Sequence, residues 1–337
     1  MVRQDRTAKG GCATKNRVRS GSMRVFIAGA SGVLGRRLVR QFAARGHTVL
    51  GLARSPKAEI AVKEAGGEPR QGDLFDAESL ARAAEGCDTV IHAATAIPVK
   101  QKTTPADWAM NDHIRRKGTR CLTEAAAKIG AKTYLQQSIA WVARPKDDSP
   151  FDEDSPCIPE PGTQSAIDGE KIAREAESSE GFTVSILRCG FFYDSESAHT
   201  RMFAEALRKR QLPIIGGGIA EWAMIHTDDA ASAYVAAAEK PTSDVWHIVD
   251  NELVEVRTFL KEFAARLCAP APRRVPTWLA RWLASEQAVA YFTRSTRTTN
   301  ARFRRDFSWA PRYPTYRDGL NQIIAAWKPE GVSRATA

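Results

Sequence analysis

Short apolar runs alternate with amphipathic segments through the first two thirds of the chain. Runs rich in β-branched and other apolar residues predict strands over residues 24–28, 48–52, 89–94, 133–138 and 183–188, with one further short strand before Gly72. The segments between them have apolar residues at helical spacing; in segment 33–45 these are Val33, Leu34, Leu38, Val39 and Phe42. Strands that alternate with helices in this way predict βαβ units and an α/β fold with a parallel sheet.

The organisation of the chain changes near residue 190. Before that point, helices are predicted over 108–129 and about 166–179, on either side of an exposed loop rich in Pro, Asp, Glu and Ser. Beyond it the regular alternation of strands and helices loosens. We therefore expect one domain over 23–188 and a smaller C-terminal lobe over 189–330, interleaved with the last strands of the sheet.

The basic net charge is concentrated at the N-terminus. The chain has a formal net charge of +10, and about half of it comes from residues 1–22, where Arg3, Arg6, Lys9, Lys15, Arg17 and Arg19 stand against Asp5. This segment is polar and has no periodicity, so we predict a disordered basic tail. The charge left on the body suits an anionic cofactor or substrate as well as it suits DNA, and we expect no nucleic-acid partner.

Cysteine spacing and hydropathy argue against disulfide-rich, metal-binding and membrane-spanning proteins. The six cysteines form no C-x-x-C pair and no histidine cluster accompanies them, which argues against a disulfide framework or a metal site. No apolar run approaches the roughly 20 residues that a membrane helix needs, and no secretory signal precedes the first strand. We expect a cytoplasmic protein without a membrane partner.

A glycine-rich loop follows the first predicted strand and leads directly into the first predicted helix. It reads Gly29-Ala30-Ser31-Gly32-Val33-Leu34-Gly35. In this pattern the first glycine permits a tight turn, the second lets the backbone approach a pyrophosphate, and the third lets the helix pack closely on the sheet. The helix N-terminus adds free N–H groups and the positive end of a dipole. The loop predicts a Rossmann-type, doubly wound sheet that binds NAD(P); a glycine-rich turn without a ligand is the alternative.

The end of the second strand indicates which dinucleotide is preferred. NAD-binding proteins usually have Asp or Glu there, bonded to the ribose 2′-hydroxyl. This chain has Arg54 instead, and Arg36 follows the loop. A guanidinium can form two parallel hydrogen bonds to a 2′-phosphate, so we predict NADP(H) as the cofactor, with NAD as the alternative. Arg54 could also be a solvent-exposed loop residue without a role in binding. Asp73 is expected to touch adenine, to cap the following helix, or to do both.

Together these segments resemble the extended short-chain dehydrogenase/reductases, the NAD-dependent epimerase/dehydratase group. The resemblance runs from about Met23 to Trp327 and rests on the order of several motifs. After the glycine loop these are Gly72-Asp73-Leu74, the strand 90–94, the Gly118-Thr119 helix, the segment 187–193, the segment 222–231, and Thr299-Asn300-Ala301-Arg302 with the segment 307–311. The resemblance implies that Leu74, Ala93, Ala94 and Thr95 also border the cofactor.

The catalytic pattern of that family is altered in this chain. The family uses a Ser or Thr, a Tyr, a Lys four residues after the Tyr, and often an Asn. The resemblance places the lysine at Lys171, but Ile167 stands at the tyrosine position. Ser138 lies one residue before the usual hydroxyl position, which Ile139 occupies, and Arg115 replaces the asparagine. The chain therefore resembles the atypical members of the superfamily, which keep the cofactor site while the catalytic tetrad is degraded.

The remaining candidates for chemistry are few. We take Lys171, Ser138 and Tyr193 as candidate catalytic residues, with Lys171 as a proton donor or only a contact to the cofactor. Tyr193 either reaches the substrate or forms an aromatic wall for the nicotinamide. Arg115 binds an anionic substrate or pairs with a carboxylate, and His226 is interpreted as structural. Trp108, Trp141, Phe191, Phe192 and Trp222 are expected to border the substrate cleft or to pack in the core.

Two functions remain open. The first is NADP(H)-dependent hydride transfer, as an oxidoreductase or epimerase, on a small carbonyl, alcohol or sugar-like substrate without the usual tyrosine. The second is a catalytically degenerate protein that binds NADP(H) as a sensor or scaffold. The expected partner is a small-molecule substrate, and a homodimer is left open.

Overall fold

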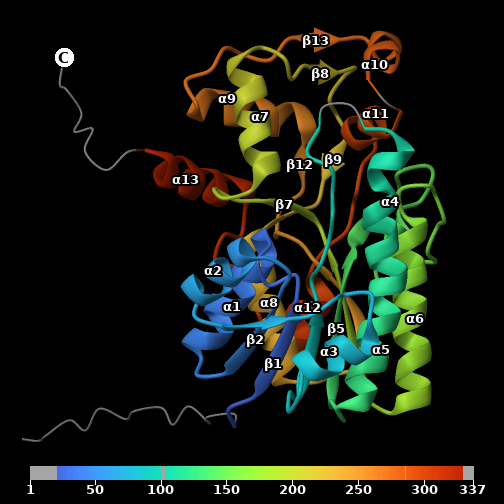
Figure 1. The fold of residues 1–337 in the computed structure, drawn as a ribbon. Helices are drawn as coiled ribbons and strands as arrows, with labels where there is room; N and C mark the ends of the chain where they lie inside the picture. Colours follow the sequence, from blue (N-terminus) through green and yellow to red (C-terminus); the bar gives the residue numbers. More distant parts are fainter. Residues whose placement is uncertain (1–20, 101–102, 285, 329–337) are drawn as a thin grey trace, which may run out of the picture.

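The computed structural model describes residues 21–100, 103–284 and 286–328 (Figure 1). Nearly all of the basic tail predicted over 1–22 lies outside the described residues. At the centre is a seven-stranded sheet with the order β11-β6-β5-β4-β1-β2-β3, in which every neighbouring pair is parallel. The predicted doubly wound α/β fold is therefore confirmed. Its strands are β1 (Arg24–Ala28), β2 (Thr48–Ala53), β3 (Glu68–Gln71), β4 (Thr89–His92), β5 (Thr133–Ile139), β6 (Thr183–Cys189) and β11 (Asp244–Ile248).

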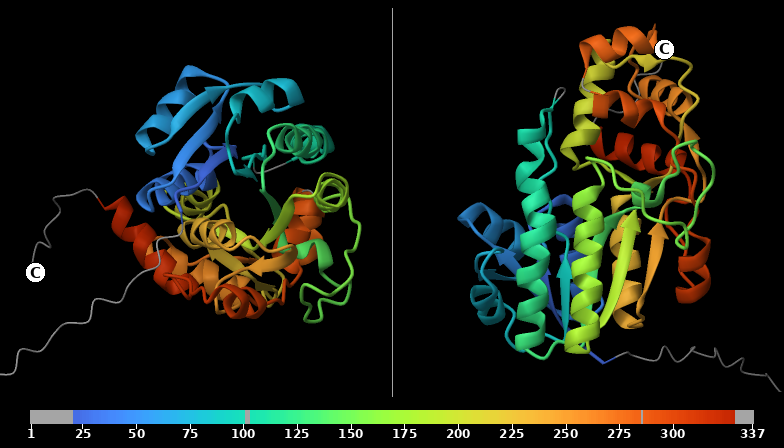
Figure 2. Two further views of the ribbon diagram at one scale, coloured as in Figure 1. Left: turned by 90° about the horizontal axis from the view of Figure 1, so that it is seen from below. Right: turned by 90° about the vertical axis from the view of Figure 1, so that its right-hand side faces the viewer.

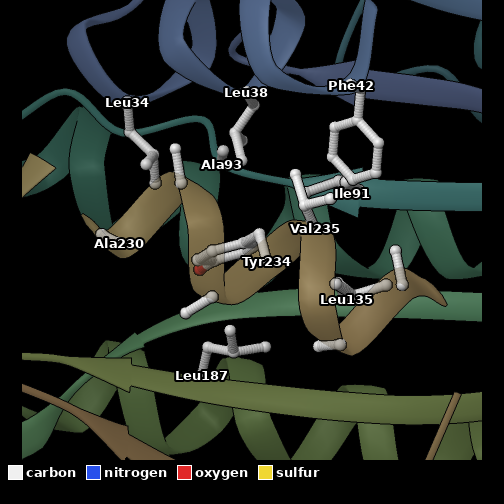
Figure 3. Packing of buried hydrophobic residues seen from close by; sticks show 14 of the residues in the cluster. Leu34, Leu38, Phe42, Ile91, Ala93, Leu135, Leu187, Ala230, Tyr234 and Val235 are labelled. Carbon is white, nitrogen blue, oxygen red and sulfur yellow. The ribbon is translucent and has the colours of Figure 1, made fainter. Parts of the chain in front are cut away.

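Helices cover both faces of the sheet. One face carries α1 (Val33–Ala44), α2 (Pro56–Glu64) and α8 (Thr227–Glu239); the other carries α3 (Ala77–Ala83), α5 (Thr119–Lys128) and α6 (Gln164–Glu180). Figure 3 shows Leu34, Leu38 and Phe42 of α1 facing Val235 of α8, with Leu135 and other sheet residues below. Each such fully buried apolar side chain contributes about 1.5–3 kcal/mol to the free energy of folding. Burial on both faces explains why the strands are almost continuously apolar.

The long helix predicted over 108–129 has an interruption that the apolar pattern does not reveal. It begins as α4 (Pro105–His113), passes through a five-residue π-helical turn, η1 (Ile114–Gly118), and continues as α5. A π turn adds one residue to a helical turn and so shifts the face on which later side chains lie. The structure thus corrects the expectation of a single regular helix. The turn lies at Arg115, which replaces the family's asparagine.

The second part of the chain forms a lobe and also completes the sheet. The lobe stands beyond the carboxyl ends of the strands, where doubly wound folds bind their ligands (Figures 1 and 2). The chain returns from the lobe to the sheet for α8, β11 and α12 (Ala301–Phe307), and α12 packs against β11. The remaining elements are η2 (Ala140–Ala143), β7 (Phe191–Tyr193), α7 (Ala198–Arg208), β8 (Ile214–Ile215), β9 (Glu221–Trp222), β10 (Met224–His226), β12 (Val254–Glu255), α9 (Val256–Arg266), β13 (Arg274–Val275), α10 (Thr277–Leu283), α11 (Glu286–Thr293), α12 (Ala301–Phe307) and α13 (Tyr316–Trp327).

Candidate functional site

The glycine loop forms a tight backbone cradle between β1 and α1. Gly29 has a φ of +91°, and a Cβ there would lie 2.6 Å from the carbonyl carbon and oxygen of Ala93 and from the nitrogen of Ala94. The N–H of Gly32 donates to the carbonyl of Gly29 at 2.9 Å, and Gly32 is the N-cap of α1 without any side-chain cap. The first turn of α1 contains no acidic residue that would occupy its free N–H groups. This geometry fits a pyrophosphate, because the glycines allow a tight turn at the N-terminus of α1, where free N–H groups and the helix dipole favour an anion.

The other predicted cofactor contacts have different surroundings. The loop brings Ala93 and Ala94 against Gly29, while Thr95 is exposed just beyond them. Leu74 is buried and lies close to Gly118. Asp73 is exposed, and its carboxylate accepts the N–H of Phe75 at 3.0 Å in a local turn. Within the loop, Ala30 and Leu34 are buried, and Ser31 and Val33 are partly buried.

Two arginines flank this cradle, and they differ in whether the guanidinium is already bound to other groups. Arg36 donates to the carbonyl of Ser31 at 3.1 Å and to the carboxylate of Glu196 at 2.7 Å. Arg54 is exposed directly after β2, and within the described residues its guanidinium has no hydrogen-bond partner and no carboxylate within 4 Å. Of the two, Arg54 is therefore the arginine that is free to bind an anion.

The structure does not bring Lys171 to this site. Its side chain is 75% exposed and pairs with Glu175 one helical turn away, at 3.7 Å. The buried face of α6 is instead formed by Ser165, Ala166, Gly169, Glu170 and Ala173. Since successive residues rotate by about 100° around a helix, position 171 points away from that face. The sequence-based assignment of a catalytic lysine at this position is corrected on this geometry, and α6 contains no tyrosine.

Ser138 is buried at the end of β5 and belongs to an ionic network. Its hydroxyl donates to the carboxylate of Glu170, which also accepts the Nε of Arg188 at 2.9 Å and its Nη2 at 2.7 Å. Arg188 Nη2 further contacts the sulfur of Cys157 at 3.0 Å, and burial raises the pKa of that thiol. Because its hydroxyl is bound to Glu170, Ser138 holds β5 to α6 rather than facing a reacting group. Sequence reasoning missed the Glu170–Arg188 pair.

A small apolar cluster joins the end of β5 to the start of α6, and it includes Ile139 and Ile167, the residues that the resemblance places at the hydroxyl and tyrosine positions. Ile139, Val142 and Ala166 form a small buried cluster, with Trp141, Cys157 and Ile167 packed at its edge. Neither Ile139 nor Ile167 can donate or accept a proton. These two side chains therefore offer no group for proton transfer.

Tyr193 lies within the packing of the lobe. It is 2% exposed, and its hydroxyl donates to the carboxylate of Asp250 at 2.7 Å. Burial, together with the nearby Asp250 carboxylate, raises the pKa of the Tyr193 hydroxyl well above its ordinary value. A phenol held in this way joins β7 to the segment after β11, so the structure does not support Tyr193 as a proton donor. Its neighbour His226 caps α8 by accepting the N–H of Asp228, in line with a structural role.

An aromatic wall joins the sheet to the lobe. Trp141 stacks on Phe191 with ring centroids 4.5 Å apart, and Tyr291 of α11 meets Phe191 edge-on at 4.7 Å. Trp222 lies behind them, fully buried, with its Nε1 bonded to the carbonyl of Tyr291. Phe192 points elsewhere and packs against the α1–α8 core. Sequence reasoning missed Tyr291, which is far away along the chain.

These features define a nucleotide-binding protein of the extended short-chain dehydrogenase/reductase class. Residues 25–249 match the NAD dependent epimerase/dehydratase family, and the chain belongs to that family. A 3-diazoavenalumate denitrifying reductase from a Streptomyces species is 32% identical over 311 residues, covering 89% of this chain and 100% of that protein. The membership and this relative support a nicotinamide dinucleotide cofactor and an oxidoreductase or epimerase activity.

Solved structures show the same fold. A dTDP-glucose 4,6-dehydratase from Streptomyces venezuelae with bound NAD superposes with a TM-score of 0.74 at 22% identity, covering 90% of this chain and 96% of that one. A human epimerase family protein with NADPH gives a TM-score of 0.75 at 19% identity, covering 90% and 99%.

The described ranges show no metal-binding cluster and no membrane-spanning helix. Within them, His, Cys, Asp and Glu side chains do not gather into any group of three or more suited to a metal ion. Over the same ranges, the helices are too short or too polar to span a bilayer.

Proposed function

We propose that the chain is an NADPH-dependent reductase that transfers hydride to its substrate without a tyrosine–lysine pair. The observation that carries the proposal is a contrast within one site. The glycine cradle is complete, whereas the positions for proton transfer are filled by the apolar cluster around Ile139 and Ala166. Such a site suits a reaction that needs the cofactor but no acid from the protein.

The residues of the chain divide the binding of the cofactor between them. The backbone of Gly29, Gly32 and the first turn of α1 holds the pyrophosphate, and Arg54 binds the 2′-phosphate. Ala93 and Ala94 close the cradle from β4. When bound, the dihydronicotinamide supplies a hydride. The preference for NADPH over NADH rests on Arg54 and on the missing acidic residue after β2.

The absence of a proton donor in the protein limits which substrates can accept the hydride. Reduction of a carbonyl requires a proton for the alkoxide, whereas an electrophile that expels a neutral group does not. The name of the denitrifying reductase relative points to a diazo compound as its substrate. When an arenediazonium cation accepts a hydride, a C–H bond forms, the C–N bond breaks and N₂ leaves with the bonding pair, so the charges balance without a proton. We propose an aromatic electrophile of this kind, held against Trp141, Phe191 and Tyr291.

The experiment uses NADPH carrying deuterium at the transferable position of the dihydronicotinamide. The protein is incubated with arenediazonium salts, aldehydes, ketones and nucleotide sugars, and the products are examined by mass spectrometry. Deuterium in the arene together with release of N₂ is the expected result. Gly32→Asp serves as the matched control, because it should block the cradle and leave only background reduction.

Tight NADPH binding without deuterium transfer to any acceptor would overturn this assignment. The degraded tetrad would then favour the second function, a cofactor-binding sensor or scaffold. In that case a partner protein should bind with an affinity that changes when NADPH is added.

A further inference from the structure

The helix that precedes α5 carries three buried hydrogen-bond donors. Trp108 and Asn111 lie three positions apart on one face of α4, and Arg115 follows four positions later, within the π turn η1. Figure 1 shows α4 alongside α6, reaching toward the lobe, and α4 and α6 are in contact. We call Trp108, Asn111 and Arg115 the donor row.

The first two members of the donor row lack acceptors within the described part of the chain. Asn111 is fully buried; its Oδ1 accepts the N–H of Ala96 at 3.0 Å, while its Nδ2 has no partner. The Nε1 of Trp108 is also buried without an acceptor. A buried donor without an acceptor is costly, and native structures seldom retain one unless a ligand, water or ion completes it. Two such groups on one helical face indicate a shared ligand.

Arg115 supplies a buried positive charge next to these two donors. It is 9% exposed, and its Nη1 lies 3.4 Å from the hydroxyl of Ser165. Among the described residues no carboxylate lies within 4 Å of its guanidinium, so the alternative of a carboxylate pair is not observed. Asp112 and Glu170 are the acidic groups whose charges act on it, and Glu170 is already bound to Arg188 and Ser138. Burial lowers the pKa of Arg115 to about 10, which leaves it charged at neutral pH.

The backbone fixes where this charge lies. The carbonyl oxygen of Arg115 is 2.9 Å from the position of a Cβ on Gly169 and accepts the hydroxyl of Thr119 at 2.6 Å. The π turn is thereby pressed against α6 at the level of Ser165 and Ala166. Ala166 packs with Ile139 in the apolar cluster, so Arg115 lies next to the site assigned to the reaction.

We propose that the donor row binds a carboxylate on the substrate, with Arg115 as its ionic partner. All three groups are donors, a guanidinium matches a carboxylate in a two-pronged geometry, and a buried cation without a counterion requires an anion. The inference rests on the proposed function, which supplies the aromatic electrophile. It adds that this substrate is an aryl carboxylate, with its ring against the aromatic wall and its acid group at Arg115.

The test measures binding to the NADPH-loaded protein by calorimetry, so that it does not depend on turnover. The probes are cinnamate, phenylacetate and benzoate, each paired with its neutral amide. We expect at least one acid to bind tenfold or more tightly than its amide. Arg115→Gln should abolish that preference, and Arg115→Lys should restore part of it. Arg116→Gln is the matched control, since Arg116 is exposed and pairs with Asp168, and it should leave the preference unchanged.

Three results would overturn the proposal. One is the absence of any preference for acid over amide in all three pairs. Another is an equal loss in the Arg116→Gln protein. The third is a loss of NADPH affinity in Arg115→Gln, which would place Arg115 on the cofactor. If the acid preference is present but no deuterium transfer is found, the carboxylate site stands and only the assigned reaction fails.

Discussion

The carbonyl oxygen of Gly29 lies only 2.0 Å from the position that a Cβ on Gly35 would occupy. The third glycine of the loop is therefore required by the close approach of α1 to the end of β1. We expect Gly35→Ala to destabilise the protein by about 1–3 kcal/mol, because α1 must move away from the sheet. Urea denaturation followed by far-UV circular dichroism measures this loss, and an unchanged midpoint would contradict the stated packing.

Gly32 should respond differently, because it borders the ligand. A Cβ there would lie 3.2 Å from the carbonyl of Gly29, and its φ of −74° is open to any residue. Gly32→Asp should fold normally, since aspartate is a favourable N-cap. Its carboxylate would occupy the anion cradle, so the Kd for NADPH should rise at least a hundredfold in calorimetry. Retained NADPH affinity would exclude the cradle as the cofactor site.

Arg54 should determine which dinucleotide is preferred. An ionic hydrogen bond to a phosphate contributes about 1.5–3 kcal/mol, which corresponds to roughly a 10–100-fold change in Kd. We therefore expect Arg54→Glu to weaken NADPH binding by that factor while NADH binding stays the same or improves. Lys261→Glu, an exposed charge reversal on α9, is the control for a general electrostatic effect. An equal loss of affinity for NADPH and NADH would show that Arg54 does not bind the 2′-phosphate.

Lys171 should be dispensable, although the resemblance to the family places the catalytic lysine there. Its ammonium faces solvent and meets only Glu175. An exposed pair one turn apart contributes about 0.3–0.5 kcal/mol. Lys171→Ala should therefore change NADPH affinity and turnover by no more than about twofold, measured side by side with the wild-type protein. Loss of turnover would mean that α6 is rotated relative to the arrangement described here.

The fold could be predicted because its signals are local. Each strand and most helices show their own apolar periodicity, and the glycine loop combines a strand, a turn and a helix within a few residues of Gly32. The π turn at Arg115 could not be predicted, since one additional residue in a helical turn leaves no compositional mark. Its position depends on the contact between η1 and Gly169 of α6, which is tertiary.

The candidate site was predictable only on the cofactor side. Counting along a motif places Lys171 at the site, whereas the face of α6 that meets the sheet is set by Glu170 binding Arg188 of β6, eighteen residues further along the chain. Tyr291 reaches Phe191 from α11, a hundred residues away, so no local pattern links them. The aromatic side chains come from separate elements, and their juxtaposition appears only after folding.

His92 should make the protein sensitive to acid. Its ring is buried between β4 and the π turn, where Nε2–H donates to the carbonyl of Ile114 at 3.4 Å and Nδ1 accepts the N–H of Ala94 at 3.3 Å. Burial lowers the pKa of His92 from 6.5 to about 4. Below pH 6.5 His92 is protonated in the unfolded chain but stays neutral in the folded protein. The contribution of His92 to the free energy of unfolding is therefore present above pH 6.5 and is lost as the pH falls toward 4. The loss expected from this histidine is on the order of 3 kcal/mol.

The variant His92→Gln isolates that contribution, because glutamine cannot titrate yet keeps an N–H for the carbonyl of Ile114. Its free energy of unfolding at pH 7 should be lower than that of the wild type by about 1 kcal/mol, the value of one buried hydrogen bond. Urea unfolding at a series of pH values from 7 to about 4 should then show a smaller acid loss in the variant, while the contributions of other histidines cancel in the difference. Parallel acid losses in the two proteins would mean that the folded ring takes up a proton as readily as the unfolded one. A charged ring would in turn demand an acceptor at Nδ1, where the structure places the N–H of Ala94.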